Sequence, residues 1–78
     1  MKRGSVEETV LKYLKEILER EDIQMDMELL GEEGISSIEA MDLLGNLEDQ
    51  FKIRIFSRDL WQVDTVKDLI DMLMSKLD

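Results

Sequence analysis

Two adjacent serines, Ser36 and Ser37, occupy the predicted start of a helix and are the residues best placed for covalent chemistry. Ser36 and Glu39 match a capping box, in which the serine oxygen accepts from a helix amide and the glutamate reaches back. Ser37 is then the first residue inside the helix, and its hydroxyl has no capping duty. Unpaired amides and the positive end of the helix dipole favour a negative group there. The spacing suits a phosphate ester on Ser37, although most serines at this position are ordinary helix starts.

The residue types that the sequence lacks restrict the chemistry further. It contains no histidine and no cysteine, which excludes an imidazole base, a thiolate nucleophile and a disulfide. It also has no P-loop, no glycine-rich dinucleotide fingerprint and no histidine-bearing metal motif. Carboxylates scattered on helices do not by themselves predict an active site. We therefore expect a protein that is not an enzyme, and any thiol that it uses must come from outside the polypeptide.

One pattern resembles a calcium-binding loop. Oxygen-bearing side chains fall at the first, third, fifth, seventh and twelfth positions of such a loop, namely Asp22, Gln24, Asp26, Glu28 and Glu33. The position at which that loop turns on a glycine is Met27. Because of this mismatch, no metal site is expected.

Negative charge is concentrated in the middle of the chain. The formal net charge is -9, and the segment from Glu21 to Phe51 contains ten acidic residues with no lysine or arginine. Such a field repels nucleic acid and anionic membranes and attracts basic protein surfaces. An acidic surface that serves only solubility is the alternative. No apolar run approaches the roughly 20 residues of a membrane span, and the N-terminus lacks a signal-peptide stretch. A cytoplasmic protein without nucleic-acid or membrane partners is expected.

The elements that must position Ser37 follow from apolar spacing. A first helix is expected at about 6–20, with Ser5 and Glu8 as a capping box and a stripe of Val6, Val10, Leu14, Ile17 and Leu18. A long loop at about 21–35 should be pinned across the bundle by Ile23, Met25, Met27, Leu29 and Leu30. A short strand is less favoured there because no partner strand is evident. Gly31 and Gly34 permit a turn before the next helix.

The second half of the chain predicts two more helices. The second should bury Ala40, Leu44, Leu47 and Phe51, whereas Ile38 and Met41 lie off this stripe, on a line that continues to Gly45 and Glu48. Residues 57–61 suit one helical turn capped by Ser57. The last helix should span about 66–76, with Asp64 or Thr65 as N-cap and Val66, Leu69, Ile70 and Leu73 buried. The expected fold is a single all-α domain over 1–78, a small bundle of three to four helices with a long loop between the first two.

The segment Leu30-Gly31-Glu32-Glu33-Gly34-Ile35-Ser36-Ser37-Ile38-Glu39-Ala40-Met41-Asp42-Leu43-Leu44 resembles the attachment region of acyl and peptidyl carrier proteins. That family has a glycine-containing loop, then Asp-Ser-Leu, then an acidic amphipathic helix. The resemblance continues without a gap to Leu73, with Phe51 at the end of the second helix, Ile53 and Ile55 after it, and Val63-Asp64-Thr65-Val66 at the turn before the last helix.

The resemblance implies a carrier that holds acyl or aminoacyl groups as thioesters on 4′-phosphopantetheine attached to Ser37. By the same resemblance, Asp42, Glu48 and Asp49 are the acids that partner enzymes read, Ile38 and Met41 form the apolar part of that surface, and Ile55 and Leu60 line a cleft for the cargo. The implied partners are a phosphopantetheinyl transferase, a loading ligase or transferase, and downstream synthase enzymes with basic docking patches. Such a carrier is expected to be monomeric.

The sequence departs from the family pattern in ways that indicate a specialised carrier. Ser36 replaces the usual aspartate, and Gly45 stands where the family has a larger apolar residue. Lys52, Arg54 and Arg58 add positive charge beyond the acidic helix. Arg58-Asp59-Leu60-Trp61 resembles the Arg-Asp-x-Trp of D-alanyl carrier proteins, which points to aminoacyl cargo. The competing interpretation is an acidic helical interaction module without a prosthetic group.

Overall fold

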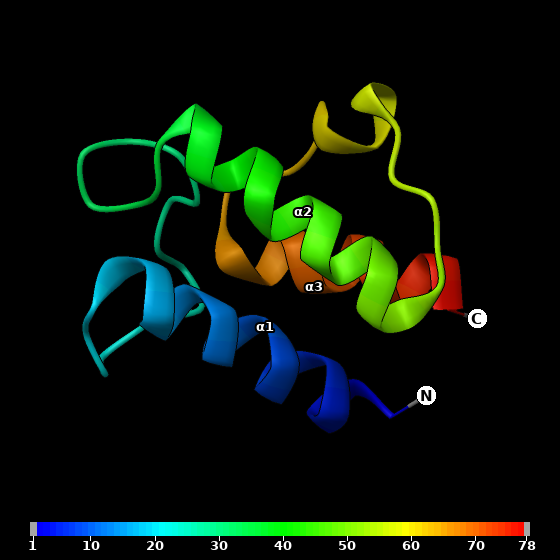
Figure 1. Ribbon diagram of the computed structural model, residues 1–78, viewed down its shortest axis with the longest axis horizontal. Helices are drawn as coiled ribbons and strands as arrows, with labels where there is room; N and C mark the ends of the chain where they lie inside the picture. Colours follow the sequence, from blue (N-terminus) through cyan, green and yellow to red (C-terminus); the bar gives the residue numbers. More distant parts are fainter. Residues whose placement is uncertain (1, 78) are drawn as a thin grey trace.

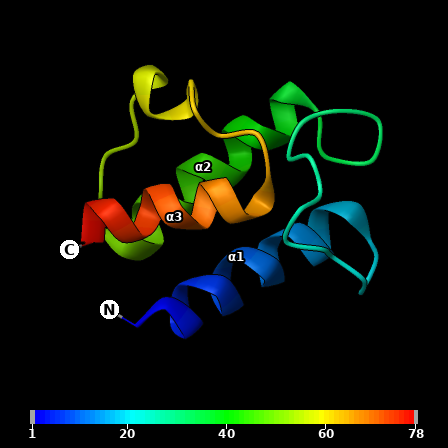
Figure 2. The same cartoon turned by 180° about the vertical axis from the view of Figure 1, so that it is seen from behind.

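The computed structural model describes residues 2–77 and is all-helical, as predicted. Helix α1 spans Arg3–Leu18, α2 spans Ser37–Phe51, the short 3-10 helix η1 spans Ser57–Leu60, and α3 spans Val66–Leu77. The long loop between α1 and α2 lies at one end of the bundle, and the first turn of α1 and the last turn of α3 lie at the other (Figure 1). Seen from behind, the connection that carries η1 runs on the side of the bundle away from α1 (Figure 2).

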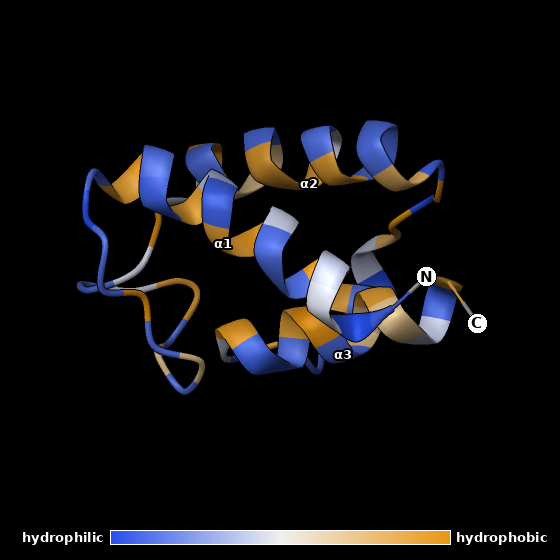
Figure 3. Cartoon of the chain, turned by 90° about the horizontal axis from the view of Figure 1, so that it is seen from below, coloured by the Kyte–Doolittle hydropathy of each residue, from blue (hydrophilic) through white to orange (hydrophobic). Residues whose placement is uncertain are grey.

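All three long helices and the loop contribute to one hydrophobic core. Figure 3 shows the apolar sides of α2 and α3 turned toward the space between the helices. The buried side chains are Val6, Val10 and Leu14 of α1, Leu43, Leu47 and Phe51 of α2, Val66, Leu69, Ile70 and Leu73 of α3, and Met27, Leu29 and Ile35 of the loop. None of the helices within residues 2–77 is long and apolar enough to cross a bilayer.

The loop between α1 and α2 is pinned to the bundle, as the sequence predicted. Met27 and Leu29 are buried, and the Leu29 amide donates to the Asp64 carbonyl at 2.8 Å while the Val66 amide donates to the Met27 carbonyl at 3.1 Å. These bonds tie the loop to the start of α3. Leu30, in contrast, is half exposed and does not serve as an anchor.

The predicted bounds of the first helix were wrong at both ends. The helix begins at Arg3 rather than Val6, its N-cap is Lys2, and no capping box forms at Ser5. The Arg3 guanidinium lies 2.9 Å from the Glu7 carboxylate and 2.8 Å from that of Asp71 on α3. These pairs stabilise an extra N-terminal turn, so that Ser5 lies inside the helix. At the other end, Glu19 adopts a left-handed conformation with φ 54° and stops the helix before Arg20.

The buried stripe of α2 is rotated slightly from the predicted one. Leu43, Leu47 and Phe51 are its buried residues, whereas Ala40 and Leu44 are only partly buried at its margin. Leu43 and Leu44 are adjacent and equally apolar, so helical spacing alone does not distinguish them. Packing decides which of the two is buried: Leu43 lies in the core that α2 shares with α1 and α3, whereas Leu44 lies at its margin.

The two later helix starts depend on aspartates that accept backbone hydrogen bonds. Ser57 is the first residue of η1 and not its cap; instead the Phe56 amide donates to the Asp59 carboxylate at 2.7 Å. At α3 the cap is Thr65, whose hydroxyl accepts from the Asp68 amide at 3.1 Å. The Asp68 carboxylate in return accepts from the amides of Asp64 and Thr65 at 3.0 and 3.1 Å. This exchange is a capping box with aspartate in place of glutamate.

The capping role of Asp68 predicts a pH-dependent contribution to stability. The amides of Asp64 and Thr65 lower the pKa of the Asp68 carboxyl below its usual range. A carboxyl whose pKa is lowered by folding stabilises the fold above its unfolded pKa of about 4, and this contribution is lost as the pH falls through the folded value. We therefore expect Asp68→Asn to lower the melting temperature most near neutral pH and least in acid. Thermal unfolding from neutral to acidic pH measures this difference, with Asp26→Asn as the control; a difference that is constant across pH would contradict the assignment.

Candidate functional site

The N-terminus of α2 is built as the sequence predicted. Ser36 has extended backbone angles, and its hydroxyl accepts from the Glu39 amide at 3.2 Å. The Glu39 carboxylate accepts from the Ser36 amide at 2.9 Å. The capping box is therefore complete, and the Ser36 hydroxyl is engaged with the backbone. Serine thus replaces the aspartate of the family pattern without loss of the cap.

Ser37 is the first residue of α2, and its side chain is exposed. Among residues 2–77 its hydroxyl takes part in no hydrogen bond, in contrast with that of Ser36. The first amides of a helix have no intrahelical partner; here the Glu39 amide is capped and the Ala40 amide donates to the Ser36 carbonyl. The amides of Ser37 and Ile38 remain at the positive end of the helix. This arrangement fits a phosphate ester on the Ser37 oxygen, because both the amides and the helix dipole favour negative charge there.

A buried anchor fixes where Ser37 stands. Ile35, two residues earlier, is 1% exposed, and its amide donates to the Leu29 carbonyl at 2.8 Å. Residues 34 and 35 cross residues 28 and 29 of the same loop. At this crossing the backbones are so close that a Cβ added to Gly34 would overlap the backbone oxygens of Glu28 and Leu29. The chain therefore turns tightly, buries Ile35, and emerges with Ser37 at the surface.

The exposed face of α2 carries most of the predicted partner-binding residues. Ile38 and Met41 are 79% and 74% exposed, which is unusual for large apolar side chains. Asp42 and Asp49 are exposed on the same helix. We call these four residues the acidic face. Glu48 is only partly exposed and accepts a hydrogen bond from the Ile55 amide at 2.8 Å, so it also fastens the chain that follows α2.

The two predicted cleft residues differ in their relation to the groove at the end of α2. Ile55 and Leu60 are both partly buried. Ile55 lines a groove of about 450 Å³ at the C-terminal end of α2, together with Lys52, Arg54 and Phe56, but Leu60 does not line it.

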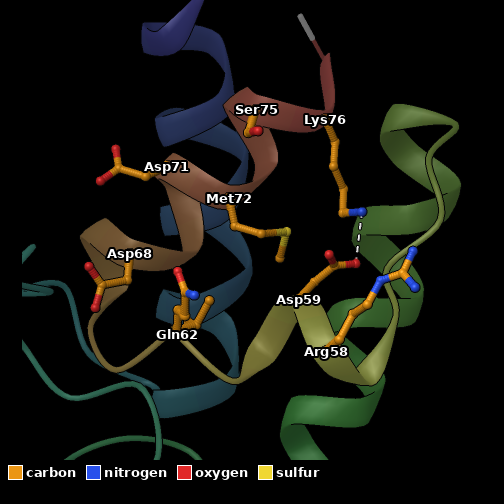
Figure 4. Close-up of a pocket in the computed structure, with 9 residues that line it drawn as sticks. Arg58, Asp59, Gln62, Asp68, Asp71, Met72, Ser75 and Lys76 are labelled. Atoms are coloured by element: carbon orange, nitrogen blue, oxygen red, sulfur yellow. Dashed lines mark ion pairs between the residues drawn. The ribbon is translucent and has the colours of Figure 1, made fainter.

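A larger groove of about 610 Å³, which the sequence analysis did not predict, lies between η1 and α3. In Figure 4, Lys76 reaches from the last turn of α3 to Asp59 on η1, and Met72 lies between the two elements. The Lys76 ammonium is 2.7 Å from the Asp59 carboxylate, and together with the Phe56 amide it lowers the pKa of Asp59. These residues are far apart in the sequence, so no local pattern could have identified the pair.

The structure is thus of the class of small helical domains, with an exposed serine at the N-terminus of α2. Comparison with known proteins gives the family. The family described as "Phosphopantetheine attachment site" matches residues 8–73. An acyl carrier protein from Coprothermobacter proteolyticus is 32% identical over 76 residues, which cover 90% of this chain and 93% of the relative. The chain therefore belongs to the phosphopantetheine-binding acyl carrier family.

Membership of this family gives the role and the cofactor. The chain is a carrier that holds acyl groups on 4′-phosphopantetheine, and it is not a catalyst. Its partners are enzymes of the transferase and synthase type that act on such carriers. The family assignment also decides against an acidic interaction module without a prosthetic group.

Proposed function

We propose that Ser37 is the residue that bears the phosphopantetheine arm. The observation that carries this proposal is the contrast between two neighbouring hydroxyls. That of Ser36 is bonded to the Glu39 amide, whereas that of Ser37 is exposed and unbonded among the described residues. Only the Ser37 hydroxyl can form an ester without the loss of a capping hydrogen bond.

The prosthetic group supplies a terminal thiol, which this cysteine-free chain lacks, and the thiol carries the cargo as a thioester. The chain's own residues position the group. The buried Ile35 and the Ser36 cap hold the attachment oxygen at the surface. The amides of Ser37 and Ile38, at the N-terminus of α2, would stabilise the negative charge of a phosphate ester on Ser37. The acidic face then presents the loaded arm to enzymes.

Intact mass spectrometry tests the attachment directly. The apo chain is incubated with coenzyme A, magnesium and a broad-specificity phosphopantetheinyl transferase, and the modified peptide is then fragmented. We expect one adduct, located on Ser37. An adduct on Ser36 would contradict the assignment of the free hydroxyl, and a chain that stays unmodified would contradict the proposed function.

We propose that partner enzymes dock on the acidic face through basic residues. Ile38 and Met41 offer a small apolar contact, and Asp42 and Asp49 surround it with negative charge. Charge of this kind accelerates association and sets orientation without requiring tight binding. A carrier that must leave one enzyme for the next benefits from such a weak interface.

The different environments of the acids on α2 predict different effects of their removal. Asp42→Asn with Asp49→Asn should lower kcat/KM for phosphopantetheine transfer by roughly three- to tenfold at low ionic strength, because electrostatic steering is weakened. Glu48→Ala should instead lower stability by about 1 kcal/mol, because the Ile55 amide loses its acceptor. Transfer kinetics over a range of salt and thermal unfolding measure the two effects. A rate loss that persists at high salt would argue against steering.

The cargo is proposed to be acyl or aminoacyl and to reach the region of Ile55 and Leu60. Both residues belong to the connection between α2 and α3 and are partly buried, and Met72 and Met74 of α3 are partly buried neighbours of the core. Methionine adapts to ligands of different shape. Loaded forms should then melt at temperatures that rise with the length of the acyl chain. Equal melting temperatures for short and long chains would mean that the cargo remains in solvent.

We further propose that residues 1–78 act as one domain and as a monomer. The match of the family to residues 8–73 supports a single domain. Strong net negative charge opposes self-association. Sedimentation velocity of the apo and modified chains measures the state directly, and a concentration-dependent dimer would contradict it.

A further inference from the structure

Three cations just beyond α2 have no ion-pair partner within residues 2–77, although the chain is rich in acids. The ion pairs within residues 2–77 engage the five basic residues Arg3, Lys15, Arg20, Lys67 and Lys76. None of them engages Lys52, Arg54 or Arg58, which are all exposed. The chain has 19 acidic residues, so three unpaired cations within seven positions form a local departure from its overall charge.

Two exposed aromatic side chains accompany these cations. Trp61 is 81% exposed and Phe56 is 45% exposed. The Arg58 guanidinium lies over the Phe56 ring at 5.1 Å from its centre. The Trp61 amide donates to the Arg58 carbonyl, and residues three apart in a 3-10 turn project from the same side. Lys52, Arg54, Phe56, Arg58 and Trp61 therefore form a basic-aromatic segment.

The groove of about 450 Å³ at the end of α2 lies between this segment and the acidic face. Lys52, Arg54 and Phe56 line one side of it, Ile53 and Ile55 contribute apolar surface, and Glu48 and Asp49 line the α2 side. Glu48 is engaged by the Ile55 amide. Asp49 belongs to the acidic face and marks the border at which the surface changes sign.

We propose that the basic-aromatic segment is a second interaction surface, which binds a protein partner through carboxylates that surround an apolar pocket for Trp61. Tryptophan and arginine are the residue types that most often dominate binding energy at protein interfaces. Unpaired cations at such a surface favour a partner that presents acidic residues, because charges across an interface are complementary. A polyanion such as nucleic acid, or an anionic membrane, does not suit it, because the neighbouring acidic segment repels both.

This surface gives the carrier a means of selecting partners. An enzyme with a uniformly basic docking site would be attracted by the acidic face and repelled by the basic-aromatic segment. An enzyme with basic groups for the acidic face and acids for the segment would be favoured at both. Specificity of this kind arises from repulsion of wrong partners as well as attraction of the right one. That the partner is an enzyme acting on the loaded carrier rests on the proposed function; the existence of the surface does not.

A selection with a random 12-residue peptide library on phage tests the proposal on the apo chain. Enriched peptides should be acidic and should contain aromatic or aliphatic residues that complement Trp61. Trp61 is the single tryptophan, so its fluorescence reports binding of the synthetic peptide directly. Arg54→Gln with Arg58→Gln should weaken that peptide by at least about tenfold, as expected for the loss of hot-spot charges.

A matched control separates local from overall charge. Lys2→Gln with Lys12→Gln makes the same change in net charge at the cap of α1 and within α1, on the side of the bundle away from η1. It should alter affinity by less than about twofold, because salt screens exposed charges that lie far from the bound peptide. The proposal is overturned if no peptide is enriched, if the enriched peptides are basic, if both double variants weaken binding equally, or if duplex DNA or anionic vesicles shift Trp61 fluorescence as strongly as the peptide. Ser37→Ala should bind the peptide with the same affinity as the unmodified wild-type chain. A failure of the proposed interaction surface can therefore be distinguished from a failure of the proposed phosphopantetheine attachment.

Discussion

Replacing Ser37 with alanine should give a chain that folds normally and accepts no phosphopantetheine. The hydroxyl makes no hydrogen bond within residues 2–77, so its removal leaves no buried polar group unpaired. Alanine is also well tolerated inside a helix. Stability should therefore change by no more than about 0.5 kcal/mol. The adduct, in contrast, should disappear completely, because the attacking oxygen is gone.

The neighbouring substitution should have the opposite pattern of effects. Ser36→Ala removes the acceptor of the Glu39 amide and breaks the capping box. Loss of an N-cap serine costs about 1 kcal/mol, which in a domain of this size lowers the melting temperature by about 4–8 °C. Phosphopantetheine transfer should continue on Ser37, at a lower rate if the first turn of α2 frays.

The pair of variants is informative because the two serines are adjacent and chemically identical. Intact mass measures the adduct, and thermal unfolding measures the cap. If Ser37→Ala is destabilised as much as Ser36→Ala, its hydroxyl has a structural role that the geometry does not show. If Ser36→Ala loses the adduct while it remains fully folded, the modified oxygen is that of Ser36 and not that of Ser37.

The start of α2 could be predicted because its determinants are local. Ser36, Ser37 and Glu39 lie within four positions, and both hydrogen bonds of the capping box join residues in this short segment. The exposure of Ile38 and Met41 was likewise predictable, since their positions fall outside any buried stripe that includes Leu47 and Phe51. The proposed attachment site is thus encoded in a few consecutive residues.

The features that could not be predicted depend on contacts between residues that are far apart in the sequence or on the path of the chain. The early start of α1 is supported by the pair between Arg3 and Asp71 of α3. The pair between Asp59 and Lys76 likewise joins η1 to the end of α3. The double role of Glu48 could not be seen either, because its acceptor position for the Ile55 amide depends on the path of the chain after α2.

A second large effect is expected at Gly34, where alanine should destabilise the fold strongly. An added Cβ would overlap the carbonyl oxygens of Leu29 and Glu28. Both oxygens are backbone atoms, so no rotamer change can relieve the overlap. The crossing that would have to move also carries the hydrogen bond from the Ile35 amide to the Leu29 carbonyl. We expect a loss of about 2–3 kcal/mol, as for overpacked sites, and slower phosphopantetheine transfer because Ile35 positions the start of α2.

Gly45 provides the matched control, because the same substitution there should have the opposite sign. Gly45 lies within α2, and apart from the helix's own backbone an added Cβ would meet no atom of residues 2–77 within 4 Å. Alanine in a helix interior is more favourable than glycine by about 0.5–1 kcal/mol, because glycine loses more conformational freedom on folding. Gly34→Ala should therefore lower the free energy of unfolding and Gly45→Ala should raise it. The two variants should differ from each other by roughly 3 kcal/mol, which urea denaturation resolves easily. Equal stability of the two variants would mean that the loop does not cross itself at Gly34, and the buried anchor that holds Ser37 at the surface would have to lie elsewhere.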